Sequence, residues 1–300
     1  MYDMLTQIWD HLLPLDVLIA PQYLISCVPI AYVIYRMRRI KIGFWRWLLP
    51  KEIYTHKSTL LDVKLFLLGR ILSISGLAGT ALMTAYFAVA FHGFLETNPR
   101  YVASPIVAAL LLFLVHDFAR YAVHRAFHNI NTIWPLHAVH HSAEVMTPIA
   151  FYRQHPLGIV VAAIGLAAFS GVGQGMILAL LSAELTSLQI AGLNIFFVIG
   201  ILLMGNFHHS HIWVSFGPIV ERLIISPAQH QIHHSTDPQH YNKNYGTTLA
   251  IWDWMFGTLY VTQKEETVTF GLTSKVDAPL MTHRFWPVLI DPIKRMFLSQ

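Results

Sequence analysis

The stretch HDFARYAVHRAFH, residues 116–128, holds the first of three histidine clusters in the chain. His124 and His128 are four positions apart, so on a helix their imidazoles lie on one face. Asp117 and Tyr121 continue this face toward the start of the stretch. The spacing therefore predicts a helix that presents two metal-ligating side chains, with a carboxylate and a phenol behind them.

Two later stretches repeat one pattern, H-x-x-H-H-S. They are WPLHAVHHS at residues 134–142 and QHQIHHS at residues 229–235. In each, the first histidine is followed by two others at spacings of three and four, which again is one helical face. Together the three clusters supply eight histidines: His124, His128, His137, His140, His141, His230, His233 and His234.

Eight imidazoles indicate a metal centre with two ions, because a structural zinc takes four protein ligands and a catalytic zinc three. A lone cluster can be a solvated surface patch, but three clusters at helical spacing favour metal binding. Neutral imidazole suits Fe, Zn, Cu or Ni. The pentapeptide HRAFH has no Glu after its first His, so it lacks the general base of zinc proteases. All-nitrogen ligation favours iron redox chemistry, although residue types alone leave zinc open.

The composition is that of a membrane protein. The 300 residues are 55% hydrophobic and only 12% charged, with a mean hydropathy of +0.50, whereas soluble domains carry about a quarter charged residues. The net charge of +4 does not indicate a nucleic-acid partner, because the basic residues gather beside apolar runs. An ordinary soluble domain is excluded.

Apolar runs near 20 residues predict an all-α, multi-pass transmembrane helical bundle of about five spans. The linker at residues 36–70 holds nine of the twenty Lys and Arg residues, so the positive-inside rule places it in the cytoplasm. Alternation then puts every histidine cluster on the cytoplasmic side, in a helical cap that holds the dinuclear site. Haem ligation is disfavoured, because these histidines lie at span ends. The expected spans are Asp16–Tyr35, Ile71–Phe94, Ala103–Val123, Leu157–Leu180 and Leu185–Met204.

The fourth and fifth spans are joined by almost nothing and are rich in Gly, Ala and Ser. This composition predicts a tight hairpin of two helices.

The clusters and their surroundings resemble the fatty acid hydroxylase/sterol desaturase superfamily. The resemblance rests on the three boxes and on four flanking motifs, and it covers about residues 105–262, whereas the first hundred residues match only in being hydrophobic. It therefore implies a catalytic domain at residues 105–262, with an N-terminal membrane region at residues 1–104 before it and a cytosolic tail at residues 263–300 after it. The motifs are D-F-x-x-Y-x-x-H-R-x-x-H at Asp117–His128, R-x-H-P at Arg153–Pro156, K-N-Y-G at Lys243–Gly246 and W-D-x-x-F-G-T at Trp252–Thr258.

The resemblance implies two iron ions, and it carries the ligand role over to the eight histidines of the boxes. The segment NFHHSHIW after the fifth span should add a ninth, and its F-x-H-S pattern selects His209. Relatives often have Asn where this chain has His211, so whether His211 also binds metal stays open, as it does for His155. His208 is expected to be a neighbour. No site role is expected for His11, His56, His92, His116 and His283.

Four polar residues are candidates to support the centre. Asp117, Asp237 and Asp253 could orient ligand imidazoles through the far N–H. Asp237 precedes Pro238, so a turn residue is an equal alternative. Asn244 either lines the site or caps a turn.

The resemblance implies an O2-dependent oxidoreductase that hydroxylates a C–H bond of a membrane lipid, namely a fatty acyl chain, an alkyl ether lipid or a sterol. A lipid or sterol desaturase and a carotenoid hydroxylase are the nearest alternatives. A zinc-dependent membrane hydrolase and a metal transporter are more distant, and the scarcity of ionisable residues in the fourth and fifth spans argues against transport.

Electrons must come from a separate donor. The chain has no G-x-G-x-x-G, no haem motif and no cysteine set for an iron–sulfur cluster, so a reductase, a ferredoxin or a cytochrome b5-like protein is expected. The absence of a targeting signal favours a bacterial inner membrane, with the endoplasmic reticulum left open.

Overall fold

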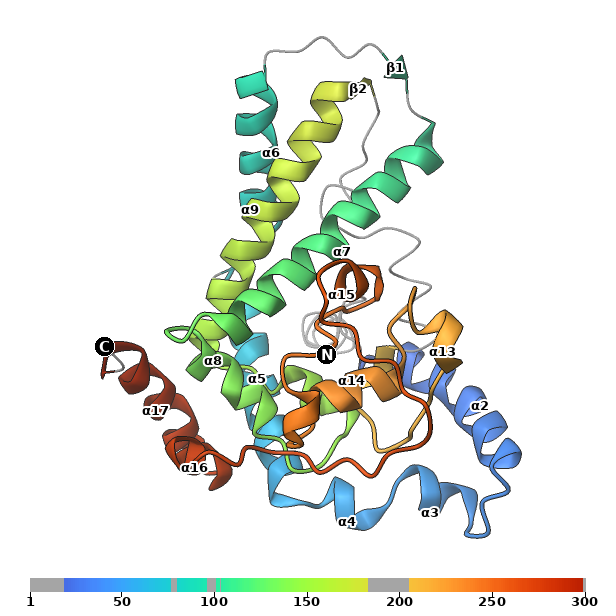
Figure 1. Ribbon diagram of the computed structural model, residues 1–300. Coiled ribbons are helices and arrows are strands. Elements are labelled where there is room, and N and C mark those ends of the chain that lie inside the picture. The colour runs from blue at the N-terminus through green and yellow to red at the C-terminus, as the bar shows by residue number, and fades with distance from the viewer. Residues whose placement is uncertain (1–18, 77–79, 96–100, 103, 183–204, 299–300) are drawn as a thin grey trace, which may run out of the picture.

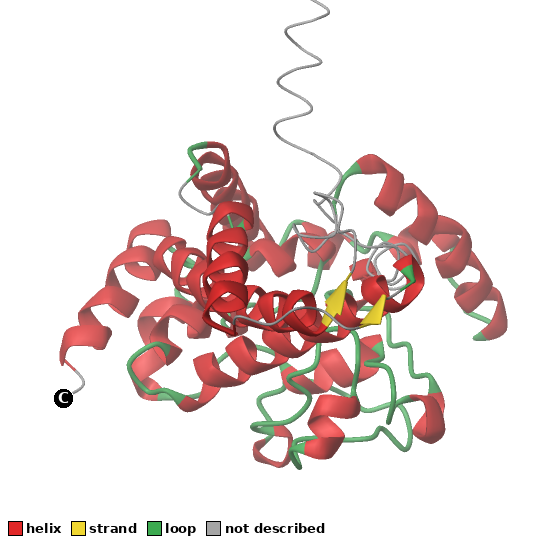
Figure 2. Cartoon of the chain, turned by 90° about the horizontal axis from the view of Figure 1, so that it is seen from above, coloured by secondary structure: helices red, strands yellow, loops and turns green. Residues whose placement is uncertain are grey.

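A computed structural model describes residues 19–76, 80–95, 101–102, 104–182 and 205–298. Helices make up nearly all of its regular structure, which confirms the predicted helical class (Figures 1 and 2). Among these residues the sheet structure is one two-residue parallel pair, β1 (Tyr101–Val102) with β2 (Leu181–Ser182).

Three long apolar helices rise together from a broader base (Figure 1). They are α6 (Ala81–Leu95), α7 (Pro105–Asn129) and α9 (Pro156–Leu180), and α9 packs against both of the others. Two of the described helices are long and apolar enough to cross a membrane, at Ile106–Asn129 and Pro156–Leu180. Lipid-like surroundings also suit α6, because Leu82 and Phe94 are 87% and 79% exposed.

Small residues set the close packing of α9. A Cβ on Gly171 would lie 2.6 Å from the carbonyl oxygen of Thr84, and one on Gly175 would lie 2.5 Å from that of Ala88. This G-x-x-x-G pair therefore lets the backbone of α6 approach α9 closely. The predicted hairpin of the fourth and fifth spans stays a prediction, because the fifth span lies outside the described residues.

The predicted spans agree only partly with the helices. The third and fourth match α7 and α9, although α7 continues six residues beyond the expected Val123. The second predicted span, Ile71–Phe94, is wrong at its start. Ile71 belongs to the last turn of α5 (Lys57–Ile74), and the helix ends before Gly76, which has a φ of 78°. The first corresponds to α2 (Pro21–Met37), whose seventeen residues are short for a span.

The base is built from short helices and loops. Along the chain they are α3 (Phe44–Leu48), α4 (Lys51–Tyr54), α8 (Trp134–His141), the 3-10 helix η1 (Pro148–Tyr152), α12 (Asn206–His208), α13 (Gly217–Val220), α14 (Pro227–His233), η3 (Pro238–His240), α15 (Ile251–Met255), η4 (Lys275–Asp277), α16 (Ala278–Met281) and α17 (Phe285–Leu298). The C-terminal α17 folds back onto α8.

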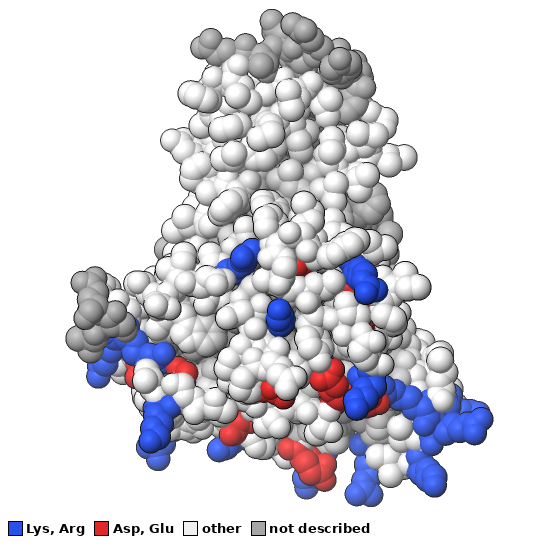
Figure 3. Space-filling view, viewed as in Figure 1, with Lys and Arg blue, Asp and Glu red and all other residues white. Residues whose placement is uncertain are grey.

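Charge divides the molecule in the same way. In the view of Figure 3, Lys, Arg, Asp and Glu side chains lie on the base and the foot of the long helices, while the upper part of the bundle shows none. A surface of this kind suits a bundle in lipid above a base in water.

Candidate metal centre

The structure brings all nine predicted histidines together in two groups. In each group the candidate ligand atoms lie within 4.8 Å of one another. The five-histidine group is His124, His128, His137, His141 and His233, and the four-histidine group is His140, His209, His230 and His234.

Local sequence explains how short segments present these rings. His124 and His128 project from the last turns of α7. The helices that carry the H-x-x-H-H boxes, α8 and α14, each have a proline in the first turn, and Ser226 and Gln229 form a capping box on α14. Proline and capping box fix the helix starts, and so set which face points inward.

The five-histidine group is a convergence of Nε2 atoms. The Nε2 atoms of His124 and His137 are 3.1 Å apart, as are those of His128 and His141. His233 completes the group with a buried Nε2 that has no hydrogen-bond partner. A nitrogen lone pair left in this position is what a metal ion would bind.

The four-histidine group has the same character. The Nε2 of His209 lies 3.2 Å from that of His140 and 3.0 Å from that of His230. His234 places its Nε2 3.2 Å from that of His230. All four rings are buried.

The two groups are adjacent. The rings of His141 and His234, one from each group, stack with centroids 4.5 Å apart and an interplanar angle of 28°. Two ions held by the two groups would therefore be neighbours, as a dinuclear centre requires.

Burial keeps these imidazoles in the neutral form that binds metal. Desolvation lowers the pKa of His140 to about 3, and lowers the pKa values of His141, His230 and His233 well below the ordinary 6.5. Nearby histidines add to the effect, because one positive ring disfavours another. Nine neutral nitrogen donors fit a pair of iron, zinc or copper ions.

The loop at residues 243–246 orients two of the rings, a role that the sequence analysis missed. The carbonyl oxygen of Lys243 lies 2.8 Å from His233 Nδ1, and that of Tyr245 lies 2.8 Å from His124 Nδ1. Asn242 and Asn244 adopt positive φ values of 60° and 55°, which asparagine tolerates better than most residues. The feature of the sequence that could have pointed to this loop was the N-K-N-Y-G motif at residues 242–246.

Asp253 acts through this loop rather than on an imidazole. Its Oδ1 accepts from Tyr245 N at 2.8 Å, and its Oδ2 accepts from Gly246 N at 2.7 Å. A Cβ on Gly246 would lie 2.8 Å from that Oδ2, so only glycine fits. Asn244 joins α14 to the following segment, since its Nδ2 donates to Gln229 O and its Oδ1 accepts from Tyr260 N.

The roles expected for Asp117 and Asp237 are corrected. Asp117 Oδ2 accepts from Leu249 N and Trp252 Nε1, at 3.1 and 2.9 Å, and among the described residues no imidazole bonds to Asp117. It lies seven residues, or about 10 Å along a helix, from His124, which is too far to orient that ring. Asp237 is exposed and caps η3 by accepting from Gln239 N, so the turn alternative holds.

The remaining candidate histidines lie outside both groups. His155 caps α9, accepting from Leu157 N through Nδ1, and His211 places Nε2 2.9 Å from Trp47 O. His208 is a neighbour, as expected, with its ring centroid 5.4 Å from that of His230.

Arg153, from the R-x-H-P motif, is fully buried beneath α8. Its guanidinium donates to Val139 O, to the Ser142 hydroxyl and, at 2.7 Å, to Asp62 Oδ1. It also donates to His283 Nδ1 at 2.9 Å, so His283, which was expected to be unimportant, belongs to this network. The network ties α5 and the C-terminal region to the helix that carries His140 and His141.

An apolar cavity of about 420 Å³ reaches both histidine groups. Its walls come mainly from α5, α7 and α9, with Phe66, Val123, Phe127, Ile159 and Leu166 among the lining residues. His124 and His137 face it from the five-histidine group, and His140, His209 and His230 face it from the four-histidine group.

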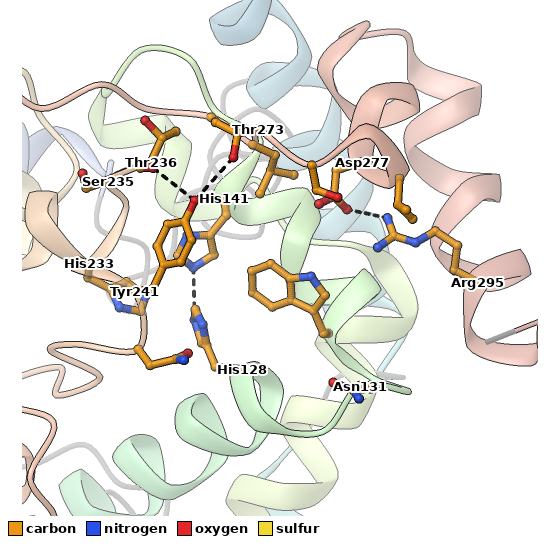
Figure 4. Close-up of a pocket in the computed structure, with 16 residues that line it drawn as sticks. His128, Asn131, His141, His233, Ser235, Thr236, Tyr241, Thr273, Asp277 and Arg295 are labelled. Atoms are coloured by element: carbon orange, nitrogen blue, oxygen red, sulfur yellow. Dashed lines mark hydrogen bonds and ion pairs between the residues drawn. The ribbon is translucent and has the colours of Figure 1, made fainter. Parts of the chain in front are cut away.

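A second, more polar cavity of about 520 Å³ touches only the five-histidine group. Figure 4 shows His128, His141 and His233 turned toward this space. The same cavity is lined by Tyr241, which bonds to Thr236 and Thr273, and by Arg295, which pairs with Asp277 at 2.6 Å. The centre thus has an apolar side and a polar side.

Residues 109–258 match the family model described as fatty acid hydroxylase. The match covers half of the 300-residue chain and contains all three histidine boxes. The chain belongs to the fatty acid hydroxylase family. It is also similar to curated proteins of the wider superfamily predicted from the boxes.

Three relatives show the range of the family. The chain is 28% identical over 189 residues to an alkylglycerol monooxygenase of Danio rerio, covering 59% of this chain and 38% of that protein. It is 27% identical over 190 residues to the ornithine lipid hydroxylase OlsE of Rhizobium tropici, covering 63% and 52%. It is 32% identical over 165 residues to the putative Delta(7)-sterol-C5(6)-desaturase 2 of Arabidopsis thaliana, covering 53% and 50%.

The chain thus spans about half the length of the second and third relatives and less of the first. No solved structure matches it. Membership of this family and the hydroxylase and monooxygenase relatives support an oxidoreductase.

Proposed function

We propose that this chain is a multi-pass membrane enzyme that uses two iron ions and O2 to hydroxylate a C–H bond of a lipid. The observation that carries the proposal is the apolar cavity, because its walls come from the apolar helices and it ends on five candidate ligands drawn from both histidine groups. A lipid chain entering between α5, α7 and α9 would lie against the whole centre.

The ligands would be the nine grouped histidines, and two bound irons would supply the oxidising chemistry with O2. The carbonyl groups of Lys243 and Tyr245 hold the proton of His233 and His124 on Nδ1, and so keep Nε2 free as a donor. Phe127 and Phe151 pack on the rings of His137 and His209, with centroids 5.4 and 5.6 Å apart. These aromatic walls exclude water from the site.

The membrane orientation supports a cytoplasmic site. The basic linker at residues 36–70 and both histidine groups belong to the base, below the apolar bundle. By the positive-inside rule this base faces the cytoplasm, in a bacterial inner membrane, where an external electron donor reaches it. The alternative of a zinc-dependent hydrolase has less support. The described residues that line the apolar cavity include no Asp or Glu that could act as a general base.

The test compares wild type with His233→Ala in cells grown under ¹⁸O2, followed by mass spectrometry of lipid extracts. A lipid that carries one ¹⁸O atom only in the wild type establishes a monooxygenase and identifies its substrate. A lipid that loses two hydrogens without label makes the enzyme a desaturase. Identical extracts, from folded and iron-loaded wild type, would count against lipid oxidation.

A further inference from the structure

Two arginines are among the residues that line the apolar cavity. Arg70, Ser73, Thr80 and Arg120 line it, and no Asp or Glu is among the described residues that do so. Arg120 lies within the candidate span of α7. An ionisable side chain at such a depth is costly and usually has a functional partner.

Arg120 shares a face of α7 with one candidate ligand. Arg120 precedes His124 by four residues on α7, and both line the cavity. Side chains at this spacing are neighbours on the helix surface, with Cβ atoms about 5–6 Å apart. Arg70 faces the same space from the end of α5, so two helices contribute one guanidinium each.

Both guanidiniums also contact the protein. Arg120 Nε lies 3.4 Å from His116 Nε2, and Arg70 Nη1 lies 3.4 Å from the Ser73 hydroxyl. A guanidinium has five N–H donors, so protein contacts and a ligand are compatible.

The negative charge of Asp117 accounts for Arg120 only in part, and does not account for Arg70. Asp117 attracts Arg120 electrostatically, yet its Oδ2 is already bonded to Leu249 and Trp252. That carboxylate does not account for a second arginine from α5 on the wall of an apolar cavity. Two guanidiniums, one of which has the Ser73 hydroxyl beside it, match an oxyanion, which Arg binds through paired N–H groups.

We propose that the lipid substrate carries a carboxylate or phosphate group that Arg70 and Arg120 bind inside the apolar cavity. This inference rests on the proposed function and names its substrate class. Because Arg120 Nε lies beside His116 Nε2, and His116 precedes His124 by eight residues, or about 12 Å along a helix, the carbon that is oxidised lies along the chain from the anionic group rather than next to it.

The test measures binding to metal-free, full-length protein in detergent micelles, so that it does not depend on turnover. Radiolabelled palmitate is the probe, and hexadecyl phosphate, hexadecanol and inorganic phosphate are the competitors. Wild type should bind palmitate or hexadecyl phosphate at least tenfold more tightly than hexadecanol. Arg70→Gln, which keeps Arg120 and Asp117 together, should reduce this preference by about tenfold. Lys64→Gln, an exposed position on the same helix, should keep it.

Wild type that binds the alcohol as tightly as both anions would overturn the proposal without any variant, and so would a preference that survives in Arg70→Gln. Displacement by inorganic phosphate as effective as by hexadecyl phosphate would contradict a lipid-borne group. None of these outcomes touches lipid oxidation, which the ¹⁸O2 experiment tests separately.

Discussion

His124 turns its Nδ1 toward the main-chain carbonyl oxygen of Tyr245, at 2.8 Å. A carbonyl only accepts, so the ring proton sits on Nδ1 and the lone pair of Nε2 points into the five-histidine group. His233 has the same relationship with Lys243 O. One loop therefore sets the tautomer of two candidate ligands, and whatever holds the loop influences the metal.

Asp253 holds that loop, so Asp253→Ala should weaken metal binding without removing a ligand. Loss of the bonds to Tyr245 N and Gly246 N is expected to lower iron affinity by about 10- to 100-fold. The affinity is measured as the iron that the protein retains at increasing chelator concentration. Asp237→Ala is the matched control, because Asp237 is exposed and caps only η3. Equal iron retention by the two variants would contradict this role for Asp253.

Arg153→Met should destabilise the fold strongly. It leaves Asp62, which is 0% exposed, as a buried charge without its partner at 2.7 Å, at a cost of about 3–5 kcal/mol. Thermal unfolding in detergent measures the effect. Arg38→Met breaks a surface pair with Glu265 and should cost at most about 1 kcal/mol. Similar losses of thermal stability in both variants would show that the buried ion pair contributes no more than the surface pair.

His283 should make stability depend on pH. Burial lowers its pKa and Arg153 lowers it further, although the hydrogen bond to Glu144 opposes both; Lys57 also faces this pair. The folded pKa therefore lies below the unfolded value of about 6.5. The contribution of His283 to the free energy of unfolding is fully present above about pH 6.5. It is lost as the pH falls toward the folded pKa, because the unfolded chain takes up the proton first.

Melting temperatures of wild type and His283→Gln between pH 7.5 and 5 check this expectation. The advantage of wild type should shrink as the pH falls. A difference between the two proteins that stays constant across this range would mean that His283 does not titrate as argued.

Filling the apolar cavity should stop turnover while metal remains bound. Ala162 lines the cavity on α9, and Ala162→Phe is expected to abolish lipid oxidation with unchanged iron content. Ile164→Phe on the same helix is the control, since Ile164 is 49% exposed and does not line the cavity. Product formation and iron content are measured together. Full activity in Ala162→Phe would place the substrate elsewhere.

Ligand chemistry and helical spacing, both visible along the chain, were enough to find eight of the grouped histidines, whereas the ninth, His209, was found through the family resemblance. Sequence reasoning misjudged Asp117, because a shared helix face does not imply contact over seven residues. The carbonyl groups of Lys243 and Tyr245 could not be predicted from side-chain types, since any residue carries a carbonyl.

The fold, like the site, could be predicted from the sequence only in part. Hydrophobic runs located α7 and α9, and they failed at Ile74, where α5 ends although the apolar composition continues. The network around Arg153 joins Asp62 to His283, residues far apart in the sequence. Spacing rules for single helices do not reach such long-range contacts.

Iron stoichiometry tests the central claim, that two groups of histidines form two metal sites. Wild type, His128→Ala from the five-histidine group and His209→Ala from the four-histidine group are loaded anaerobically with ferrous iron, freed of excess metal and analysed for metal per folded chain. The account predicts about two iron ions in wild type and about one in each variant. A single ion in wild type, or two ions still bound in both variants, would contradict it.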